Sequence, residues 1–243
     1  MVYHNGIAIL EHGDDFPDPR QGPTDDPVAI GFELTPDLML NGYGKGLFAW
    51  SDNPVTWWSP DPRAIIDLDA FHVSRRLARK IKAHPFSVTV DLAFDQVVYR
   101  CSLPRRGGEA TWISETFRRA FQELHAMGHA HSVECWQDDQ LVGGVFGVAI
   151  NGFFSAESMF HTATDASKIA LFYLIELLRR AGFQLFDIQV LTPHTESLGG
   201  REISRNEYLG RLQRALAVEP SALSPTNKKW ARFLFDNPLS RQS

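Results

Sequence analysis

Cysteine is scarce in this chain of 243 residues, which holds only Cys101 and Cys135. The two thiols lie on apolar segments with no partner at metal-ligand spacing, so the sequence predicts neither a disulfide framework nor a zinc site. Long apolar runs are also missing, because no stretch approaches the ~20 residues that cross a bilayer. No charged-then-apolar leader opens the chain. These absences predict a protein of the reducing cytoplasm with no membrane segment.

Two familiar catalytic loops are absent as well. The chain has no G-x-S-x-G elbow and no G-x-x-x-x-G-K-S/T loop, which leaves a serine triad and nucleotide hydrolysis without support. His125, His129 and His131 lie close together, but they span a predicted helix end and strand start with no acidic ligand fixed beside them. A protein metal site needs such a fixed ligand set, so we predict no metal site and no cofactor.

Positive charge is not in excess, since the formal net charge is -5 at pH 7. A chain coated by nucleic acid would be basic overall, so any RNA contact must be a local patch. The main candidate is the helix predicted over 73–82, whose basic residues are Arg75, Arg76, Arg79, Lys80 and Lys82. These side chains could follow a phosphate backbone, together with Arg105 and Arg106; the alternative is an ordinary solvated face.

The composition suits one large domain, or a small domain packed on a larger one, because 44% of the residues are hydrophobic. Residues 1–27 are rich in Pro, Asp and Gly and predict an extended arm. Thr35 and Pro36 supply the cap and first turn of a helix. The aromatic residues and prolines of 48–62 predict a fixed loop and a boundary, which gives a small N-terminal domain at 1–62 and a larger domain at 63–243.

Beyond residue 62, strand-like and helix-like patterns alternate. Apolar alternation predicts strands at 64–68, 86–90, 132–136, 141–150, 153–155 and 184–190. Helices are predicted at 73–82, 92–100, from Ser114 to Gly128, at 165–181, and after Ser204, where Glu207 completes a capping box. Strands joined both by tight turns and by helical crossovers predict an α+β fold with a mixed, largely antiparallel sheet, of the kind that acyl-transferring N-acetyltransferases use.

Two polar residues stand out on the predicted strand at 184–190. The period of two puts Asp187 and Gln189 on the same face, opposite Phe186 and Ile188. A carboxylate and a carboxamide on one rigid strand are suited to holding an amine. The alternative is a half-solvated strand that shows its polar residues to water.

Glu157 is flanked by Phe153, Phe154, Met159 and Phe160, so its carboxylate is expected in apolar surroundings that demand a cationic partner. That partner is either a ligand ammonium or an Arg or Lys of the same chain. Large rigid aromatic surface, suited to enclosing a hydrophobic side chain or a nucleobase, is supplied by Trp50, Trp112 and Phe154. Each of these three is otherwise a core residue.

Several motifs, taken together and in order, resemble the bacterial leucyl/phenylalanyl-tRNA–protein transferase family over about 28–212. They are Leu47-Phe-Ala-Trp50, Trp57-Trp-Ser-Pro-Asp-Pro-Arg63, Glu109-Ala-Thr-Trp-Ile-Ser114, Gly128-His-Ala-His-Ser-Val-Glu134, Leu141-Val-Gly-Gly-Val-Phe-Gly147, Glu157-Ser-Met-Phe160, Ala166-Ser-Lys168 and His194-Thr-Glu-Ser-Leu-Gly199. The resemblance implies transfer of Leu, Phe or Met from aminoacyl-tRNA to the N-terminal amine of proteins that begin with Arg or Lys, which marks them for degradation by the N-end rule. It also implies a small N-terminal domain followed by an acetyltransferase-like domain.

The resemblance assigns roles to individual residues. It implies that Asp187 and Gln189 are the catalytic pair and that Glu157 engages the aminoacyl group near its amine. Parts of the site for the tRNA 3′ end and the amino-acid side chain correspond to Trp50, Trp112 and Phe154. Because a carboxamide is a very poor base, we expect Gln189 to position the attacking amine, with its carboxamide polarised by Asp187.

The chain departs from the family pattern in three places. Phe32 and Glu33 replace a common Gly-Asp, which leaves the seating of the small domain open. Val145 stands where the family has Met, which leaves the preferred donor amino acid open. A tail beyond Ala215, with Trp230 among its aromatic residues, extends past the usual family end.

Two rival functions stay open alongside the transferase. An acyl-CoA-dependent N-acetyltransferase would need a Gly-rich pyrophosphate loop before its long helix, and 161–167 has no glycine. A noncatalytic tRNA- or peptide-binding relative would keep the aromatic and basic surface but lose the pair at Asp187 and Gln189, which is present. For the transferase we expect a monomer that binds aminoacyl-tRNA and an acceptor protein.

Overall fold

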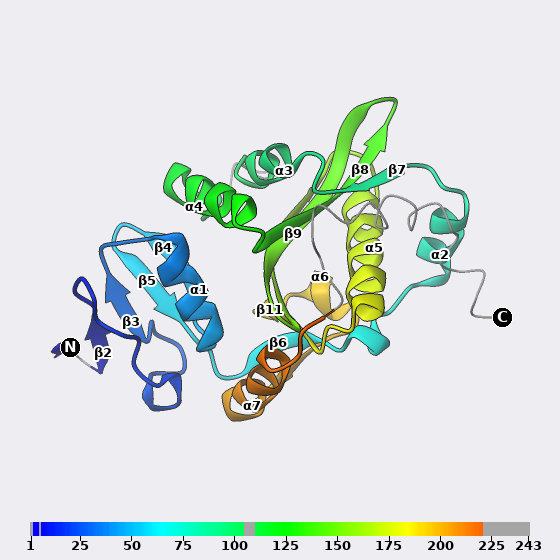
Figure 1. The fold of residues 1–243 in the computed structure, drawn as a ribbon. Helices are drawn as coiled ribbons and strands as arrows, with labels where there is room; N and C mark the ends of the chain where they lie inside the picture. Colours follow the sequence, from blue (N-terminus) through cyan, green and yellow to red (C-terminus); the bar gives the residue numbers. More distant parts are fainter. Residues whose placement is uncertain (1, 5, 105–109, 221–243) are drawn as a thin grey trace.

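The computed structural model describes residues 2–4, 6–104 and 110–220, and it contains two β-sheets (Figure 1). The smaller sheet has five strands in the order β1-β2-β3-β5-β4. Its strands are β1 (Val2–His4), β2 (Ile7–Ile9), β3 (Ala29–Gly31), β4 (Phe48–Asp52) and β5 (Val55–Trp58). Among them only β2 and β3 run parallel. The small sheet is therefore built entirely from residues before 62.

The larger sheet has seven strands in the order β12-β6-β11-β10-β9-β8-β7. Its strands are β6 (Arg63–Ile66), β7 (Ser87–Val90), β8 (Ala130–Gln137), β9 (Gln140–Ile150), β10 (Phe153–His161), β11 (Leu185–Gln189) and β12 (Gly200–Ile203). All neighbours are antiparallel except β10 and β11. The sheet is thus mixed and largely antiparallel, which confirms the predicted α+β class.

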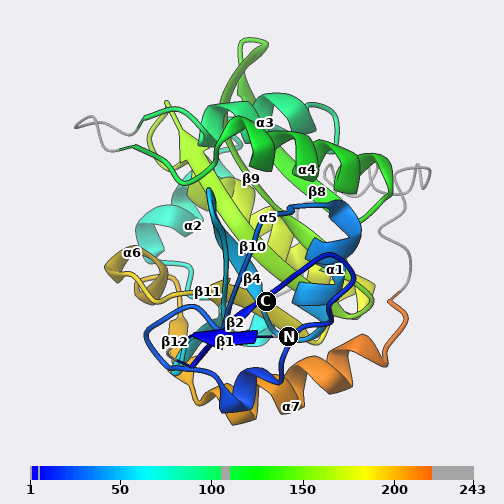
Figure 2. The same cartoon turned by 90° about the vertical axis from the view of Figure 1, so that its left-hand side faces the viewer.

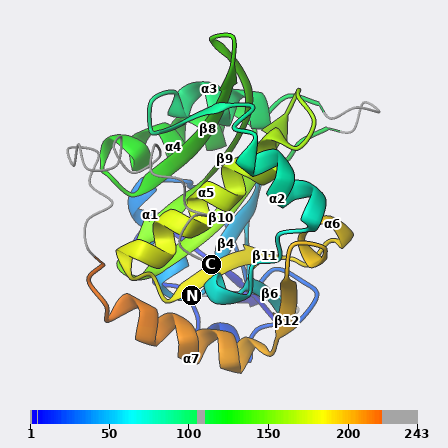
Figure 3. The ribbon, with the colours of Figure 1, turned by 90° about the vertical axis from the view of Figure 1, so that its right-hand side faces the viewer.

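Helices cover both faces of the larger sheet (Figures 1 and 3). The helices of the described residues are α1 (Pro36–Gly44), α2 (Arg75–Lys82), α3 (Phe94–Cys101), α4 (Glu115–Ala126), α5 (Ala166–Ala181), α6 (Pro193–Glu196) and α7 (Arg205–Leu216), with short 3-10 turns at Pro19–Gln21 and Leu68–Ala70. The long helix α5 lies across one face, and α3 and α4 cover the other. Among the described residues, no helix has the length and apolar character needed to cross a membrane.

Side-chain caps fix where most of the helices start. Thr35 accepts from the Leu38 amide at 3.2 Å, and Pro36 follows at the first helical position, as predicted. Ser114 caps α4 in the same way, and Ser204 accepts from the Glu207 amide at the start of α7. These bonds satisfy amides that the first helical turn leaves without partners.

Turn chemistry ends the elements as the sequence predicted. The α5 helix closes at Gly182, whose φ of 88° is in the left-handed region that glycine adopts at low cost. The hairpin between β8 and β9 turns at Asp138 and Asp139, with φ of 49° and 59°. Two consecutive positive φ values are typical of the tight turn that matches the twist of paired strands.

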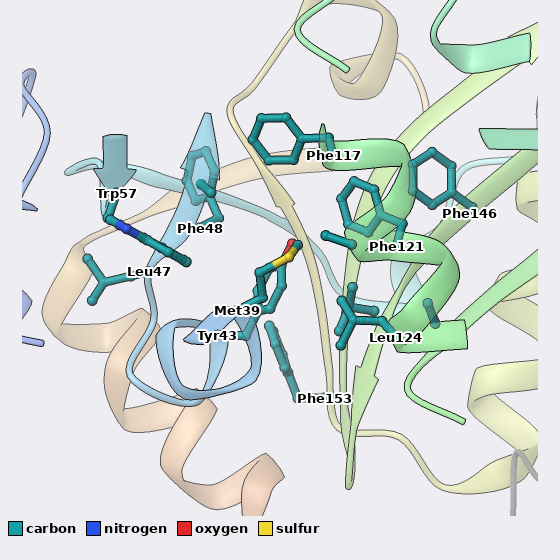
Figure 4. Packing of buried hydrophobic residues seen from close by; sticks show 14 of the residues in the cluster. Met39, Tyr43, Leu47, Phe48, Trp57, Phe117, Phe121, Leu124, Phe146 and Phe153 are labelled. Carbon is teal, nitrogen blue, oxygen red and sulfur yellow. The ribbon is translucent and has the colours of Figure 1, made fainter. Parts of the chain in front are cut away.

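Buried apolar side chains form two clusters on opposite sides of the larger sheet. One runs from the small sheet through α1 to α4 and β9, and Figure 4 shows Met39 and Tyr43 pointing from α1 toward Phe121 and Phe153. The second lies under α5. Because the first cluster is continuous across both sheets, the small sheet is packed against the larger one through α1. Figure 2 views the molecule from the side of the small sheet, whose strands lie in front of the larger sheet.

Two expectations about the N-terminal region were wrong. Part of the predicted arm at 1–27 is regular structure, because β1 and β2 add strands to the small sheet. The aromatic segment at 48–62 is largely a hairpin of β4 and β5 rather than a fixed loop. The prolines lie at or beyond the strand ends, where a missing amide costs no ladder hydrogen bond, and the aromatic residues pair across the strands. The domain boundary at residue 62 stays a prediction.

Candidate active site

Asp187 lies on β11 in the middle of the larger sheet and is fully buried. Arg63, the first residue of β6, donates twice to it: Nε to Oδ1 at 3.0 Å and Nη2 to Oδ2 at 2.6 Å. Tyr208 on α7 donates its hydroxyl to Oδ2 at 2.9 Å. The amide of Gln189 donates to Oδ1 at 2.8 Å. Each carboxylate oxygen therefore already accepts two hydrogen bonds from the protein.

The Arg63 guanidinium is enclosed on every side. Its Nη1 donates to the carbonyl oxygen of Gly46 at 3.1 Å, and its carbon lies 4.7 Å from the Phe48 ring centre and 4.4 Å from that of Tyr208. Burial acts to lower the pKa of Arg63, but the neighbouring Asp187 carboxylate outweighs it and leaves that pKa raised. Arg63 and Asp187 thus form a permanent buried ion pair. Two of the groups that enclose Arg63 come from the N-terminal region, since Phe48 begins β4 of the small sheet and Gly46 lies just before it.

Gln189 is held in a backbone conformation that residues with a side chain rarely adopt. Its φ is +62°, and the register of β11 against β6 shifts between Asp187 and Gln189. The side-chain Nε2 donates to Glu157 Oε1 at 3.0 Å and to Ser155 Oγ at 3.3 Å. The structure gives the amide oxygen no hydrogen bond within 2–4, 6–104 and 110–220. Gln189 therefore presents a rigidly held acceptor.

Glu157 has two chemically different oxygens. Three donors converge on Oε1, namely Tyr43 Oη at 2.9 Å, Ser155 Oγ at 3.0 Å and Gln189 Nε2 at 3.0 Å. Oε2 is buried and has no hydrogen-bond partner among the described residues. Burial raises the pKa of Glu157 to about 7, against the three hydrogen bonds, which favour the charged form. Oε2 is thus prepared for a proton or for a cationic ligand.

Strand irregularities bring these groups together. The register between β10 and β9 shifts between Ala156 and Ser158, so Glu157 sits in a bulge, beside the shift in β11. Bulges redirect single side chains and are common next to active sites. The structure confirms that Leu185 and Phe186 lie on opposite faces of β11, since Leu185 lies in the cluster shared with the small sheet and Phe186 in the cluster under α5.

Two sequence expectations at this site need correction. The Gln189 carboxamide does not contact Asp187, because only the backbone amide of Gln189 does so, and the carboxamide points to Glu157 and Ser155. The alternative of an internal ion pair at Glu157 is also wrong for the part of the chain that the structure describes, where no Arg or Lys pairs with it. Its three donors are all neutral, so no cation among the described residues compensates the charge of this carboxylate.

Two of the three predicted aromatic residues are accessible. Trp50 on β4 is 39% exposed and packs edge-on against Trp58 at 5.3 Å between ring centres. Trp112 is partly buried and lies against Phe117 at 4.9 Å. Trp50 also contacts the ring of Phe48, which in turn covers Arg63. An aromatic surface therefore adjoins the Asp187 network.

Phe154 and Val145 do not lie on an open surface. Phe154 is fully buried and stacks on Phe186 at 5.8 Å between ring centres, while Val145 is 2% exposed in the same cluster under α5. Phe154 points to this side because it alternates with Phe153 along β10, and Phe153 lies in the other cluster. In this conformation both residues are core, and contact with a substrate side chain stays a prediction for each.

The basic helix is mostly solvated. Four of its five predicted phosphate contacts are exposed, namely Arg75, Arg76, Arg79 and Lys82. Lys80 instead donates to the carbonyl oxygen of Thr164 at 2.5 Å and to Asp165 at 3.4 Å, ahead of α5. Arg75, Arg79 and Lys82 are available to an anionic partner, whereas Arg76 pairs with Asp165 at 4.0 Å and Lys80 joins α2 to the start of α5. Arg105 and Arg106 lie outside the described residues, as does everything beyond 220.

The histidines do not converge on a common point. His125 and His129 contact the carbonyl oxygens of Ala130 and Ala149, and His131 contacts Asp91. Within the described ranges no group of three or more His, Cys, Asp or Glu is arranged to hold a metal ion. The imidazoles serve contacts within the fold.

Sequence reasoning missed the four residues that hold this site in place: Tyr43, Arg63, Ser155 and Tyr208. Tyr43, Arg63 and Tyr208 contact the site from elements that are distant in the sequence, which local patterns do not encode. Ser155 is the exception, because it lies two residues from Glu157 on β10. The one available signal was Arg63, which ends the motif from Trp57 to Arg63. Its arginine at the start of an apolar strand is the kind of charge that burial forces into a pair.

Two family models match the chain. Residues 65–213 match the model described as leucyl/phenylalanyl-tRNA protein transferase, and residues 32–61 match the one for its N-terminal domain. The second match includes Phe32 and Glu33, where the sequence departed from the common pattern.

Curated relatives carry the same description. A leucyl/phenylalanyl-tRNA–protein transferase of Pseudoalteromonas atlantica is 45% identical over 83% of this chain and 88% of its own length. Those of Shewanella halifaxensis and of Shewanella sp. strain W3-18-1 are 43% and 41% identical, over 84% and 90% of this chain and 89% and 96% of their own lengths.

Solved structures are more distant. A GCN5-related N-acetyltransferase from Kribbella flavida aligns over 72% of this chain and 64% of its own, with 11% identity and a TM-score of 0.38. L-PGS from Bacillus licheniformis aligns over 66% and 52%, with 15% identity and a TM-score of 0.36. The α+β class follows from the strand order of this chain itself.

Proposed function

Because this chain belongs to the leucyl/phenylalanyl-tRNA–protein transferase family, we propose that Glu157 and Gln189 form the place where an aminoacyl ester meets the amine that attacks it. The protein is an aminoacyltransferase that moves Leu or Phe from aminoacyl-tRNA to the N-terminal amine of acceptor proteins. The observation that carries the assignment of the site is Glu157 Oε2, a buried carboxylate oxygen without a partner among the described residues.

The reaction asks little of a base. The attacking nitrogen forms a bond to the ester carbonyl carbon, the bond from that carbon to the tRNA 3′ oxygen breaks, and the proton lost by nitrogen ends on the leaving oxygen. An N-terminal amine has a pKa of about 8, so a useful neutral fraction exists at pH 7. Most of the catalytic demand is therefore placement of the two substrates.

Glu157 Oε2 is suited to the amino group of the aminoacyl donor. A cation beside Oε2 would supply the missing partner, and it would favour the charged carboxylate against the burial that now raises the pKa of Glu157 to about 7. The three donors on Oε1 stop the carboxylate from rotating away. The donor amine would thus be fixed at one place in the site.

Gln189 is suited to the attacking amine. Its Nε2 already faces Glu157, which leaves its amide oxygen to accept a hydrogen from the acceptor nitrogen and direct the lone pair toward the carbonyl. Asp187 is not the base, because it is fully buried and its oxygens accept four protein hydrogen bonds. It serves as the anchor of Gln189.

The accessible tryptophans and the basic helix complete the proposed donor site. Trp50 and Trp112 offer flat surface for the terminal nucleobase, and the exposed cations of α2 offer contacts to tRNA phosphates. Use of Met as a third donor, a preference for acceptors with N-terminal Arg or Lys, a monomeric state and a cytoplasmic location belong to the same proposal. The acceptor preference fits the family that the chain matches, and the other three are carried over from the sequence resemblance.

The test is transfer of labelled Leu, Phe and Met from charged tRNA to peptides that begin with Arg or Lys, with a peptide beginning with Asp as control. We expect transfer by the wild type, strong loss in Glu157→Gln and in Gln189→Ala, and unchanged tRNA binding in both. Full activity in either variant would overturn the role given to that residue. Acetyl transfer from acetyl-CoA, or tRNA binding with no transfer at all, would replace the function by one of the two rivals.

A further inference from the structure

We propose that Arg63 and Tyr208 are positioning residues that act on Gln189 through Asp187. The inference rests on the role proposed for Gln189 and adds what keeps that side chain in place. Neither Arg63 nor Tyr208 contacts Glu157 or Gln189 by a hydrogen bond in the described part of the chain, so both must act at one remove.

The first step is the way Asp187 is held. Arg63 donates to both oxygens of Asp187 through Nε and Nη2, and the Tyr208 hydroxyl also donates to Oδ2. The Tyr208 hydroxyl is also 3.3 Å from Arg63 Nη2, so the three groups form one closed set. Only Oδ1 faces the Gln189 amide. The orientation of the carboxylate, and with it the position of Oδ1, is set by Arg63 and Tyr208.

The second step is the backbone of Gln189. A φ of +62° is unfavourable for a residue with a side chain, and such a conformation persists only where the surroundings impose it. The 2.8 Å bond from the Gln189 amide to Asp187 Oδ1 is the contact that imposes it here. If Asp187 tilts, this backbone is expected to relax, and the carboxamide then leaves Glu157 and Ser155.

The third step links the network to the small sheet. Arg63 donates to Gly46, which ends the turn between α1 and β4 at φ +85°. A Cβ atom at Gly46 would lie 2.5 Å from Leu209 and 3.2 Å from Tyr208, so only glycine fits this contact with α7. Tyr43, from the preceding helix, holds Glu157. The small domain therefore supports both halves of the pair formed by Glu157 and Gln189.

The experiment is a double-mutant cycle on kcat with Tyr208→Phe and Gln189→Ala in the full chain. Tyr208→Phe removes one hydroxyl and keeps the ring over Arg63, so the variant is expected to fold. We expect it to lower kcat about 10-fold, the loss that one charge-assisted hydrogen bond represents, with KM for aminoacyl-tRNA and peptide unchanged. In the Gln189→Ala background the same change should lower kcat by less than about 2-fold, because its target is gone.

A merely structural role gives a different pattern. Equal losses of kcat in both backgrounds, a change confined to KM, or no effect of Tyr208→Phe would each overturn the inference. Wild-type activity in Gln189→Ala is a separate failure, because it removes the proposed role of Gln189 before positioning is in question. The cycle therefore separates the two proposals.

Arg63→Lys and Arg205→Lys form a matched pair. Arg205 is also a buried arginine, 3% exposed, and it joins α7 to the N-terminal segment through the carbonyl oxygens of Pro19, Gly22 and Pro23. It has no contact with Asp187 among the described residues. We expect both variants to lower the melting temperature, but only Arg63→Lys to lower kcat, by about 10-fold or more, because lysine cannot form the fork. Equal kcat values in the two variants would overturn the inference.

Discussion

Two carboxylates lie on neighbouring strands of one sheet, and the protein treats them in opposite ways. Asp187 has a cationic partner and four hydrogen bonds spread over both oxygens. Glu157 has no cationic partner in the described residues, and all three of its donors are on one oxygen. Asp187 needs nothing more from a ligand. Glu157 is complete only when something occupies Oε2, and it is therefore the carboxylate that a substrate can use.

The difference follows from where the partners come from. Arg63 reaches Asp187 because β6 and β11 are adjacent and Ile65 pairs with Asp187. Glu157 instead faces Tyr43, from α1 of the small domain, whose hydroxyl is a neutral donor. A carboxylate with hydrogen-bond partners on both oxygens can hold the neighbouring backbone in place. A buried carboxylate with partners on one oxygen only is stabilised when a ligand donates to the other. The proposed site needs both kinds of carboxylate, because Asp187 holds the backbone of Gln189 and Glu157 binds the substrate.

The largest effect is expected from Asp187→Asn. The change is nearly isosteric, but it leaves Arg63 charged, buried and unpaired. Breaking a buried pair in this way costs about 3–5 kcal/mol of unfolding free energy. Urea denaturation at pH 7.5 measures it, and transfer activity should fall in parallel because Gln189 loses its anchor.

A loss of unfolding free energy below about 1 kcal/mol for Asp187→Asn would contradict the view that Asp187 and Arg63 form a strong buried ion pair, since exposed surface pairs contribute that little. Asp69→Asn provides the control, because Asp69 pairs with Arg179 at 2.8 Å but its side chain is 89% exposed. We expect it to leave stability and activity close to those of the wild type.

The second effect is the pH dependence of stability at Glu157. Burial favours the neutral acid, so the folded chain binds more protons than the unfolded chain between pH 4.5 and about 7. Unfolding free energy should therefore fall as pH rises through this window, by about 3 kcal/mol in total, and stay level above it. Glu157→Gln removes the titration. Its stability relative to the wild type should rise by about that amount from pH 5 to pH 8.

Chemical denaturation of both proteins at the two pH values measures this difference. Gln at position 157 leaves its own buried NH2 group without an acceptor, which adds a cost that does not depend on pH. The relative change with pH, rather than the absolute stability, is hence the readout. An offset that is the same at pH 5 and pH 8 would show that Glu157 titrates in the folded chain as it does in the unfolded one.

A smaller effect is expected from Tyr43→Phe. The variant removes one of three donors from Oε1, and that donor favours the charged carboxylate. The pKa of Glu157 should rise further, and the acid limb of the activity profile should move to higher pH, with about 1 kcal/mol of stability lost. Tyr99→Phe, which changes an exposed tyrosine on α3, is the matched control. A profile that does not move would separate Tyr43 from the titration of Glu157.

Local patterns were enough to predict much of the fold. Thr35, Ser114 and Ser204 cap their helices because each side-chain oxygen accepts a hydrogen bond from the backbone amide three residues later, a contact that the local sequence alone specifies. The apolar alternation at 185–189 correctly separated Leu185 from Phe186. The strands β1 and β2 were missed, because three-residue strands in a Pro- and Gly-rich segment take their order from the sheet they join.

The site was predictable only in part, for the same physical reason. Asp187 and Gln189 were singled out by their place on an apolar strand, Glu157 by its aromatic flanks, and their roles by the family resemblance, but their partners lie far away along the chain. Tyr43 is separated from Glu157 by 114 positions and Arg63 from Asp187 by 124. Two register shifts also bring the side chains of Glu157 and Gln189 together, and the alternating pattern of a regular strand cannot predict such shifts.

The smallest effect separates substrate delivery from both carboxylates. Replacing Arg75 and Arg79 on α2 by Gln should raise KM for aminoacyl-tRNA a few-fold, leave kcat unchanged, and flatten the salt dependence of binding by about 1.4–1.8 units for two lost phosphate contacts. Lys80→Gln is the contrasting variant, since its ammonium is engaged with Thr164 and Asp165 and should add little to the slope. If all three substitutions had equal effects on the slope, exposure on α2 would not decide which cations meet tRNA. If the double variant changed kcat instead, this helix would belong to the same unit as Glu157 and Gln189.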